Sequence, residues 1–287
     1  ATPEIIATFK PFWEQLAPEY RAKLLSALAD ASETDFNFDY RELGYLGLED
    51  LDSDVRIAAI NLLWADESLT YLTTLIRFAE NDENAQVRAA AISEVGRFIL
   101  LGEYEEIPAA DASQVQDVAI NILSDSSEHV EVRRRALEAI SNSSHEIVSD
   151  AIDDAYNSDD RLMRISAIFA MGRSYDGRWK ETILRELRNG DAEIRFEAAR
   201  AAGELEVEEA IPLLGQLATE DDREVQQVSI SSLGEIGGKY ALRILSSLAE
   251  DAEESDDKDL LEDIEDAIGY ANMVGSDLEL DITDEDY

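Results

Sequence analysis

The chain of 287 residues contains no cysteine, two histidines and five lysines. Without cysteine it can form no disulfide, use no thiol nucleophile and offer no cysteine ligand to a metal. No apolar run approaches the roughly 20 residues that a membrane-spanning helix needs. The opening residues ATPEIIATFKPFW lack the basic and then apolar layout of a signal peptide. We therefore expect a cytoplasmic protein without a membrane span.

Positive charge is scarce as well. The chain has 24 Lys and Arg against 65 Asp and Glu, and its formal net charge is −41. Nucleic-acid binding requires positive charge that displaces counterions, so the composition argues against it. Such a field attracts basic partners, but an acidic surface also suits a salty cytoplasm, and both interpretations stay open. The apolar fraction of 45% is that of a folded globular protein rather than of a disordered chain.

What the sequence does have is a repeat. The stretch DRLMRISAIFAMG begins at Asp160, DAEIRFEAARAAG at Asp191 and DREVQQVSISSLG at Asp222, each start 31 residues after the previous one. A fixed period of this length is typical of a solenoid built from stacked helical hairpins.

The same pattern extends in both directions from these three copies. Its second helix is recognised by an apolar anchor, usually followed by arginine: Val55-Arg56, Val87-Arg88, Val132-Arg133, Met163-Arg164, Ile194-Arg195, Val225-Gln226 and Leu260-Leu261. Three residues before each anchor stands a capping residue: Asp52, Asn84, His129, Asp160, Asp191, Asp222 or Asp257. Nine residues after five of the anchors stands a glycine: Gly96, Gly172, Gly203, Gly234 or Gly269. We expect the glycines to end the helices, and the buried arginines to pair with the capping aspartates of adjacent repeats.

This pattern resembles the HEAT-repeat superfamily, and in particular the short HEAT-like repeats named after phycobilisome lyases. The resemblance is clearest in DSDVRIAAINLL, NAQVRAAAISEVG and the copies from Asp160 and Asp191, and it weakens at Gln226 and Leu261. It implies an all-α fold, a right-handed α-α superhelix of about seven helical hairpins. Repeats of this type mostly act as interaction surfaces and occasionally as enzymes.

The predicted organisation has three parts. Residues 1–40 form an N-terminal helical cap, 41–275 a continuous solenoid, and 276–287 an acidic tail. Arg88 and Arg133 are 45 residues apart, so about 14 residues are inserted near 98–112, where we expect a loop, either functional or simply packed. In the tail, Leu278, Leu280 and Ile282 alternate with acids, which leaves a docking motif open beside a solvated, disordered end.

Enzymatic alternatives find little support in the sequence. Deoxyhypusine hydroxylase, a HEAT-like enzyme, uses several His-Glu pairs to hold two irons, whereas this chain has the single pair His145-Glu146 and one other histidine, His129. It offers no distinctive pocket for the pigment of a bilin lyase or isomerase. It also has no Asp-x-Asp-x-Asp-Gly calcium loop, glycine-rich phosphate loop or GxSxG turn. We expect no enzyme, no cofactor and no metal.

A partner-binding site is expected on the second helices near the centre of the chain. Counted from the anchor, positions −1, +2, +6 and +10 should face solvent on the concave side. At the centre these positions carry apolar residues with arginines beside them, namely Leu162, Ile165, Phe169 and Phe196 with Arg134, Arg173 and Arg200. Residues 133–200 also hold 12 of the 24 Lys and Arg but 13 of the 65 Asp and Glu. An apolar patch rimmed by arginine is typical of an interface, although the same residues could be buried within the chain.

The predicted function is a non-enzymatic scaffold or adaptor that binds a helix or peptide of another protein on this concave patch. Two alternatives remain: an acidic surface that binds a basic protein, and a subunit of a lyase- or isomerase-like enzyme. The oligomeric state cannot be predicted from the sequence.

Overall fold

The computed structural model describes residues 3–34 and 38–281, and beyond Met273 it describes the helix but not its side chains. All regular structure in these residues is helical, and none of their helices is long and apolar enough to cross a membrane. The chain divides into two compact units, Ala1–His145 and Glu146–Tyr287.

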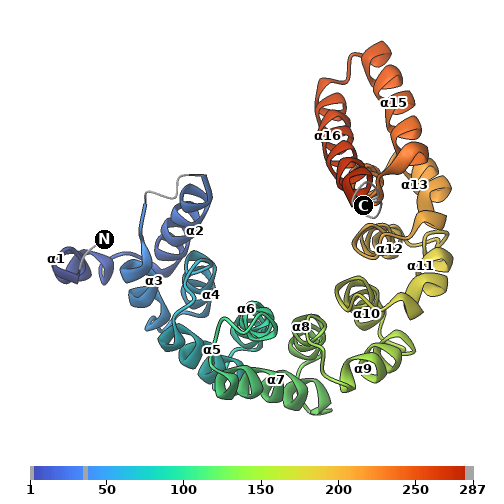
Figure 1. The fold of residues 1–287 in the computed structure, drawn as a ribbon. Helices are drawn as coiled ribbons and strands as arrows, with labels where there is room; N and C mark the ends of the chain where they lie inside the picture. The colour runs from blue at the N-terminus through green and yellow to red at the C-terminus, as the bar shows by residue number, and fades with distance from the viewer. Residues whose placement is uncertain (1–2, 35–37, 282–287) are drawn as a thin grey trace. The chain divides into compact units, whose positions relative to one another are not determined.

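The first unit is a stack of helical hairpins with two layers (Figure 1). Its helices are α1 (Pro3–Trp13), α2 (Pro18–Thr34), α3 (Arg41–Leu48), α4 (Ser53–Leu62), α5 (Leu69–Asn81), α6 (Ala85–Glu103), α7 (Ala109–Ser124) and α8 (Val130–Ile140). From α4 onward each even-numbered helix packs against the odd-numbered helix before it, and α2, α4, α6 and α8 pack against one another in sequence.

The second unit repeats this plan. Its helices are α9 (Ile147–Tyr156), α10 (Arg161–Arg173), α11 (Lys180–Glu186), α12 (Ala192–Glu204), α13 (Ile211–Leu217), α14 (Arg223–Ile236), α15 (Gly238–Ser255) and α16 (Lys258–Asp281). Short 3-10 turns, Gly177–Trp179 and Glu208–Ala210, precede α11 and α13. The layer of α10, α12, α14 and α16 is the even-numbered layer of this unit. From α3 to α16 the described helices make seven hairpins, as predicted.

The capping residues begin the second helices as predicted. Asp52 accepts hydrogen bonds from the amides of Asp54 and Val55, and Asp160 accepts one from Met163. Asn84, Asp191 and Asp222 bond their helices in the same way, and His129 does so through Nδ1. Each such cap stabilises its helix by about 1 kcal/mol, because it satisfies an amide that no carbonyl of the helix can reach.

The insertion near 98–112 is mostly helix, so the expected loop is wrong. α6 continues through Glu103, and α7 begins at Ala109, which leaves the short turn between them. Phe98 and Ile99 are fully buried, and Gly102 lies so close to Ala112 that a Cβ on the glycine would be 2.8 Å from the alanine methyl. The inserted residues therefore extend two packed helices, because their apolar residues follow helical spacing, and they do not form a surface loop.

The two ends of the chain differ from the predicted boundaries in detail. The predicted cap contains the helix pair α1 and α2, and α2 packs against α4 as the later second helices pack on one another. α16 runs to Asp281, past the predicted start of the tail at residue 276. Leu278 and Leu280 therefore lie on this helix, whereas Ile282 and the remaining residues to 287 lie outside the described residues.

Candidate partner-binding surface

A ladder of arginines runs along the even-numbered helices, but its partners are not the predicted ones. Arg56 donates to Asp82 through Nε at 2.9 Å and Nη2 at 2.8 Å, and to the carbonyl of Asp50 through Nη1. The cap of the following second helix is Asn84, so Asp82 stands two residues before it. The predicted pairing of these arginines with the capping residues is wrong, although Arg161 and Arg223, which begin α10 and α14, do bind the caps Asp191 and Asp257 of the next repeat.

Three further rungs have the same construction. An arginine in one repeat binds a carboxylate in the turn just before the next second helix in Arg21–Asp50, Arg88–Glu128 and Arg195–Glu220, with N–O distances of 2.6, 2.7 and 2.7 Å. Arg21 lies in α2, so the ladder begins within the predicted cap. Each rung ties two consecutive repeats together through the turn between their helices.

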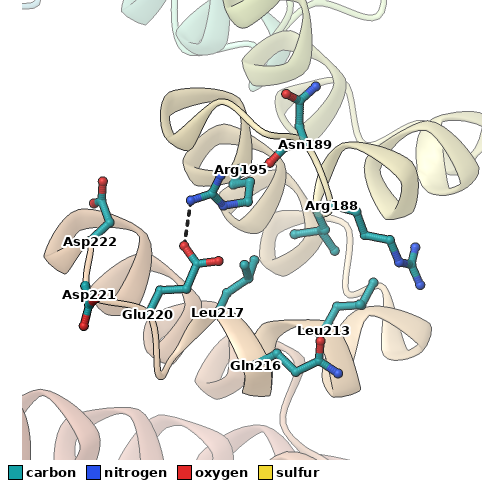
Figure 2. Close-up of a pocket in the computed structure, with 10 residues that line it drawn as sticks. Arg188, Asn189, Arg195, Leu213, Gln216, Leu217, Glu220, Asp221 and Asp222 are labelled. Atoms are coloured by element: carbon teal, nitrogen blue, oxygen red, sulfur yellow. Dashed lines mark hydrogen bonds and ion pairs between the residues drawn. The ribbon is translucent and has the colours of Figure 1, made fainter.

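The rung at Arg195 lines an open groove of about 590 Å³ in the second unit (Figure 2). Arg195 points across it to Glu220, and Leu213 and Leu217 supply apolar surface. Arg188 and Asn189 stand on one side and Asp221 and Asp222 on the other. With opposite charges on its two sides, the groove offers no convergent set of catalytic groups.

The predicted site is only partly assembled. Leu162 is exposed, with 37% of its surface accessible, and Phe169 and Phe196 are half-buried. Ile165, in contrast, is 3% exposed, so its predicted place in the patch is wrong. α10 packs against both α9 and α12, and the buried arc of a helix held from two sides is wider than a single amphipathic stripe.

Arg134 is also placed differently from the prediction. It lies on α8 in the first unit, is 8% exposed, and pairs with Glu131 at 2.5 Å and Glu138 at 3.9 Å on its own helix. Arg135 binds the same two glutamates. Arg134 is therefore buried in a local ion-pair network rather than part of an exposed rim.

The remaining four residues form what we call the Arg–Phe cluster: Phe169, Arg173, Phe196 and Arg200. The guanidinium of Arg200 lies 4.4 Å from the ring centre of Phe169 and 5.8 Å from that of Phe196, and Arg173 lies 5.6 Å from Phe169. At these distances the cations are attracted to the faces of the rings. The cluster thus presents half-buried aromatic surface with guanidinium groups above it.

Both arginines of the cluster already have carboxylate partners. Arg173 Nε pairs with Glu204 Oε1 at 3.2 Å, and Arg200 pairs with Glu197. Their side chains nevertheless remain 41% and 29% exposed. The cluster together with these glutamates is therefore close to neutral. A partner would gain more binding free energy by covering the apolar rings than by contacting the charges.

Sequence reasoning missed two buried carboxylates beside this cluster, those of Glu204 on α12 and Glu235 on α14. Glu204 Oε2 lies over Gly172, where a Cβ would be 2.3 Å away, and Glu235 Oε2 lies over Gly203, where a Cβ would be 2.1 Å away. Both oxygens are buried without a hydrogen-bond partner among the described residues. The sequence feature that could have revealed these carboxylates is the glutamate that directly follows the repeat glycine, at Gly203-Glu204 and Gly234-Glu235. α10 and α12 end one residue after Gly172 and Gly203, close to the predicted helix ends, and both glycines also seat a carboxylate of the next repeat.

The ionisation of both glutamates is disfavoured. Burial raises the pKa of Glu204, and Arg173 and Arg200 counteract this only in part. Burial also raises the pKa of Glu235, and the neighbouring charge of Glu204 raises it further. At neutral pH both groups therefore cost the folded state free energy, because each ionised carboxylate has one oxygen buried without a hydrogen bond.

Replacing Glu235 by glutamine should raise the melting temperature at pH 7. The wild-type carboxyl has a higher pKa in the folded than in the unfolded state, so its ionisation penalises folding above both values. This penalty fades as the pH falls through the raised pKa and is gone below the usual glutamate value of 4.5. Melting curves of both proteins between pH 4 and 8 should thus converge at the acid end. A difference that is constant with pH would contradict the ionic origin.

No group of three or more His, Asp or Glu side chains is placed to hold a metal ion in the part of the chain that the structure describes. His129 is occupied as a helix cap, and His145 donates its amide to Ser143. The single His-Glu pair of the sequence thus belongs to the turn that precedes α9.

Residues 180–263, which span α11 to the first turns of α16, match the family model described as HEAT repeats. These residues are HEAT repeats. The hairpins of both units share the caps and ladder of this matched part, so the chain is an all-α array of HEAT-like hairpins. The narrower assignment to the phycobilisome-lyase type stays a prediction. No curated protein matches the chain.

Several solved structures are similar to this HEAT-like array. YibA of E. coli is 18% identical over 94% of this chain and 97% of its own, with a TM-score of 0.46. Human deoxyhypusine hydroxylase is 16% identical over 89% and 98%, with a TM-score of 0.38. Pds5, solved in a Pds5–Scc1 complex, is 11% identical over 91% and 56%, with a TM-score of 0.37. At these identities and TM-scores the likeness does not extend to a function.

Proposed function

We propose that the protein is a non-enzymatic, cytoplasmic scaffold that binds a helix or peptide of another protein on the even-numbered layer of the second unit. The observation that carries the proposal is the Arg–Phe cluster together with exposed Leu162. These residues place aromatic and aliphatic surface on consecutive second helices of a strongly acidic molecule. Covering that surface would remove apolar area from water.

The geometry indicates which kind of contact the partner would make. Because Arg173 and Arg200 are already paired, a partner gains mainly by packing apolar side chains on Leu162, Phe169 and Phe196. Binding of this kind depends weakly on ionic strength. A basic partner held by the acidic surface, the second candidate, should instead dissociate as salt rises, and the net charge of −41 is what favours it.

Site-specific photo-crosslinking tests the site directly. A photoreactive phenylalanine analogue placed at Leu162 or Phe196 should capture the same partner protein in source lysate at both low and high salt. The matched control is the same analogue at Tyr240, which is 71% exposed on α15, in the odd-numbered layer of the same unit. Circular dichroism first checks that each variant is folded.

Three outcomes decide between the candidates. Capture at Leu162 and Phe196 but not at Tyr240, retained in high salt, supports the scaffold with this site. Equal capture at all three positions that disappears in high salt favours the acidic surface and a basic partner. A pigment or metal that co-purifies with the chain would favour a lyase-like enzyme subunit instead.

A further inference from the structure

Arg164 breaks the ladder in the second unit. In the rungs of Arg56, Arg88 and Arg195, the guanidinium donates to a backbone carbonyl of its own repeat and to a carboxylate of the next repeat. Arg164 occupies the same position on α10 but donates one long hydrogen bond, to the carbonyl of Ser158 at 3.3 Å. Among the described residues it has no ion pair.

The cause is the residue in the next turn. Two residues before the cap Asp191, where Asp82 and Glu220 stand before their own caps, this repeat has Asn189. Its Oδ1 accepts from the amide of Asp191 at 3.0 Å, and its Nδ2 donates to Glu186 Oε2 at 2.6 Å. Both polar atoms of the Asn189 side chain are therefore engaged in hydrogen bonds within their own repeat, and the side chain brings no negative charge to Arg164.

The unpaired guanidinium is half-buried yet reachable. Arg164 itself is partly covered. Only Nη1 donates a hydrogen bond among the described residues, so the other N–H groups of this partly exposed side chain have no protein partner there. A partly desolvated cation with open donors gains a charge-assisted hydrogen bond when an oxyanion reaches it.

The local charge allows an anion to approach. Residues 133–200, which include the α9–α10 hairpin of Arg164, hold 12 of the 24 Lys and Arg of the chain and 13 of its 65 Asp and Glu. This stretch is close to neutral within a chain whose net charge is −41. Electrostatic repulsion that would keep acidic groups away elsewhere is thus relieved around Arg164.

We propose that Arg164 is a receptor for a carboxylate side chain of the partner protein, which completes in trans the rung that Asn189 leaves open. The carboxylate would approach the open edge of the guanidinium from solvent, because Asn189 occupies the position that corresponds to Asp82. This inference rests on the proposed function for the existence of a protein partner, but the oxyanion site can be measured without that partner.

The first experiment follows the arginine Nε–H signals by NMR while inorganic phosphate replaces chloride at constant ionic strength. The signal of Arg164, assigned by its loss in Arg164→Lys, should shift and saturate. Signals of Arg56 and Arg88, whose donors are occupied by carboxylates, should stay in place. Exposed Arg188, which has no ion pair among the described residues, is the control for non-specific association. A shift of Arg164 that is absent, or linear like that of Arg188, overturns the proposal.

The second experiment uses a partner captured by crosslinking. Arg164→Gln should weaken its binding about tenfold, the loss expected for one charge-assisted hydrogen bond, whereas Arg188→Gln should not. If phosphate saturates Arg164 but Arg164→Gln binds the partner normally, the site is an oxyanion site that the partner does not use, and the proposal is overturned. If no partner is captured while phosphate saturates Arg164, it is the proposed function that fails and the oxyanion site that stands.

Discussion

Replacing Arg56 by methionine should lower the free energy of unfolding of the first unit by about 3–5 kcal/mol, the range for breaking a buried ion pair. The two side chains of this rung are 9% and 6% exposed. Methionine leaves the Asp82 carboxylate buried with a single amide donor, that of Asn84, and leaves the carbonyls of Asp50 and Leu51 without their guanidinium donor. Urea denaturation followed by the fluorescence of Trp13 and Trp64 reports on this unit.

The matched control is Arg41→Met. Arg41 pairs with Asp39 on the surface, where the side chains are 61% and 52% exposed, and its loss should cost under about 1 kcal/mol. The double variant Arg56→Met, Asp82→Asn should recover part of the loss, because it removes the stranded charge as well. Equal effects of Arg56→Met and Arg41→Met would show that the ladder does not stabilise the stack.

The second large effect is expected at Gly203, whose replacement by alanine should destabilise the second unit by about 1–3 kcal/mol. The new methyl would lie 2.1 Å from Glu235 Oε2 and 3.0 Å from the Cα of Ser232. The carboxylate can rotate away, but the backbone of α14 cannot, so α12 and α14 must separate. Urea denaturation followed by Trp179 fluorescence measures the loss.

Gly269→Ala provides the comparison within the same repeat position. Apart from its chain neighbours and the backbone of its own helix, no atom lies within 4 Å of a Cβ built on Gly269 in α16. Alanine should therefore stabilise that helix by about 0.5–1 kcal/mol, the usual gain over glycine in a helix interior. If Gly203→Ala were also stabilising, the close approach of α12 and α14 would not depend on the glycine.

The fold could be predicted because its signals are local. Period, caps and apolar anchors are properties of a single hairpin, and Asp52, Asp160 and Asp222 cap the helices that they were expected to cap. The candidate site required knowledge of the neighbouring helices, which the periodicity of one helix does not contain. Ile165 was misplaced for this reason.

The misassigned ladder has a related cause. A capping carboxylate can also bind an arginine, as Asp191 binds Arg161, but the arginines that follow the anchors bind acids in the turn before the cap. The pairing acid stands one or two residues before the cap, in a turn where its position has no helical period to reveal it. Glu204 and Glu235 escaped notice because a glutamate beside a glycine looks solvent-facing until the next helix is stacked upon it.

The open rung at Arg164 has a consequence for cooperativity. In an array of repeats, unfolding of one hairpin is resisted only by the interfaces with its nearest neighbours. The interface between the α9–α10 hairpin and the α11–α12 hairpin lacks the rung that Arg195 and Glu220 supply one repeat later, although Arg161 and Arg173 on α10 bind Asp191 and Glu204 across it. A partner that closes the rung would add one more contact across this interface, and it would therefore raise the free energy of local opening of the second unit.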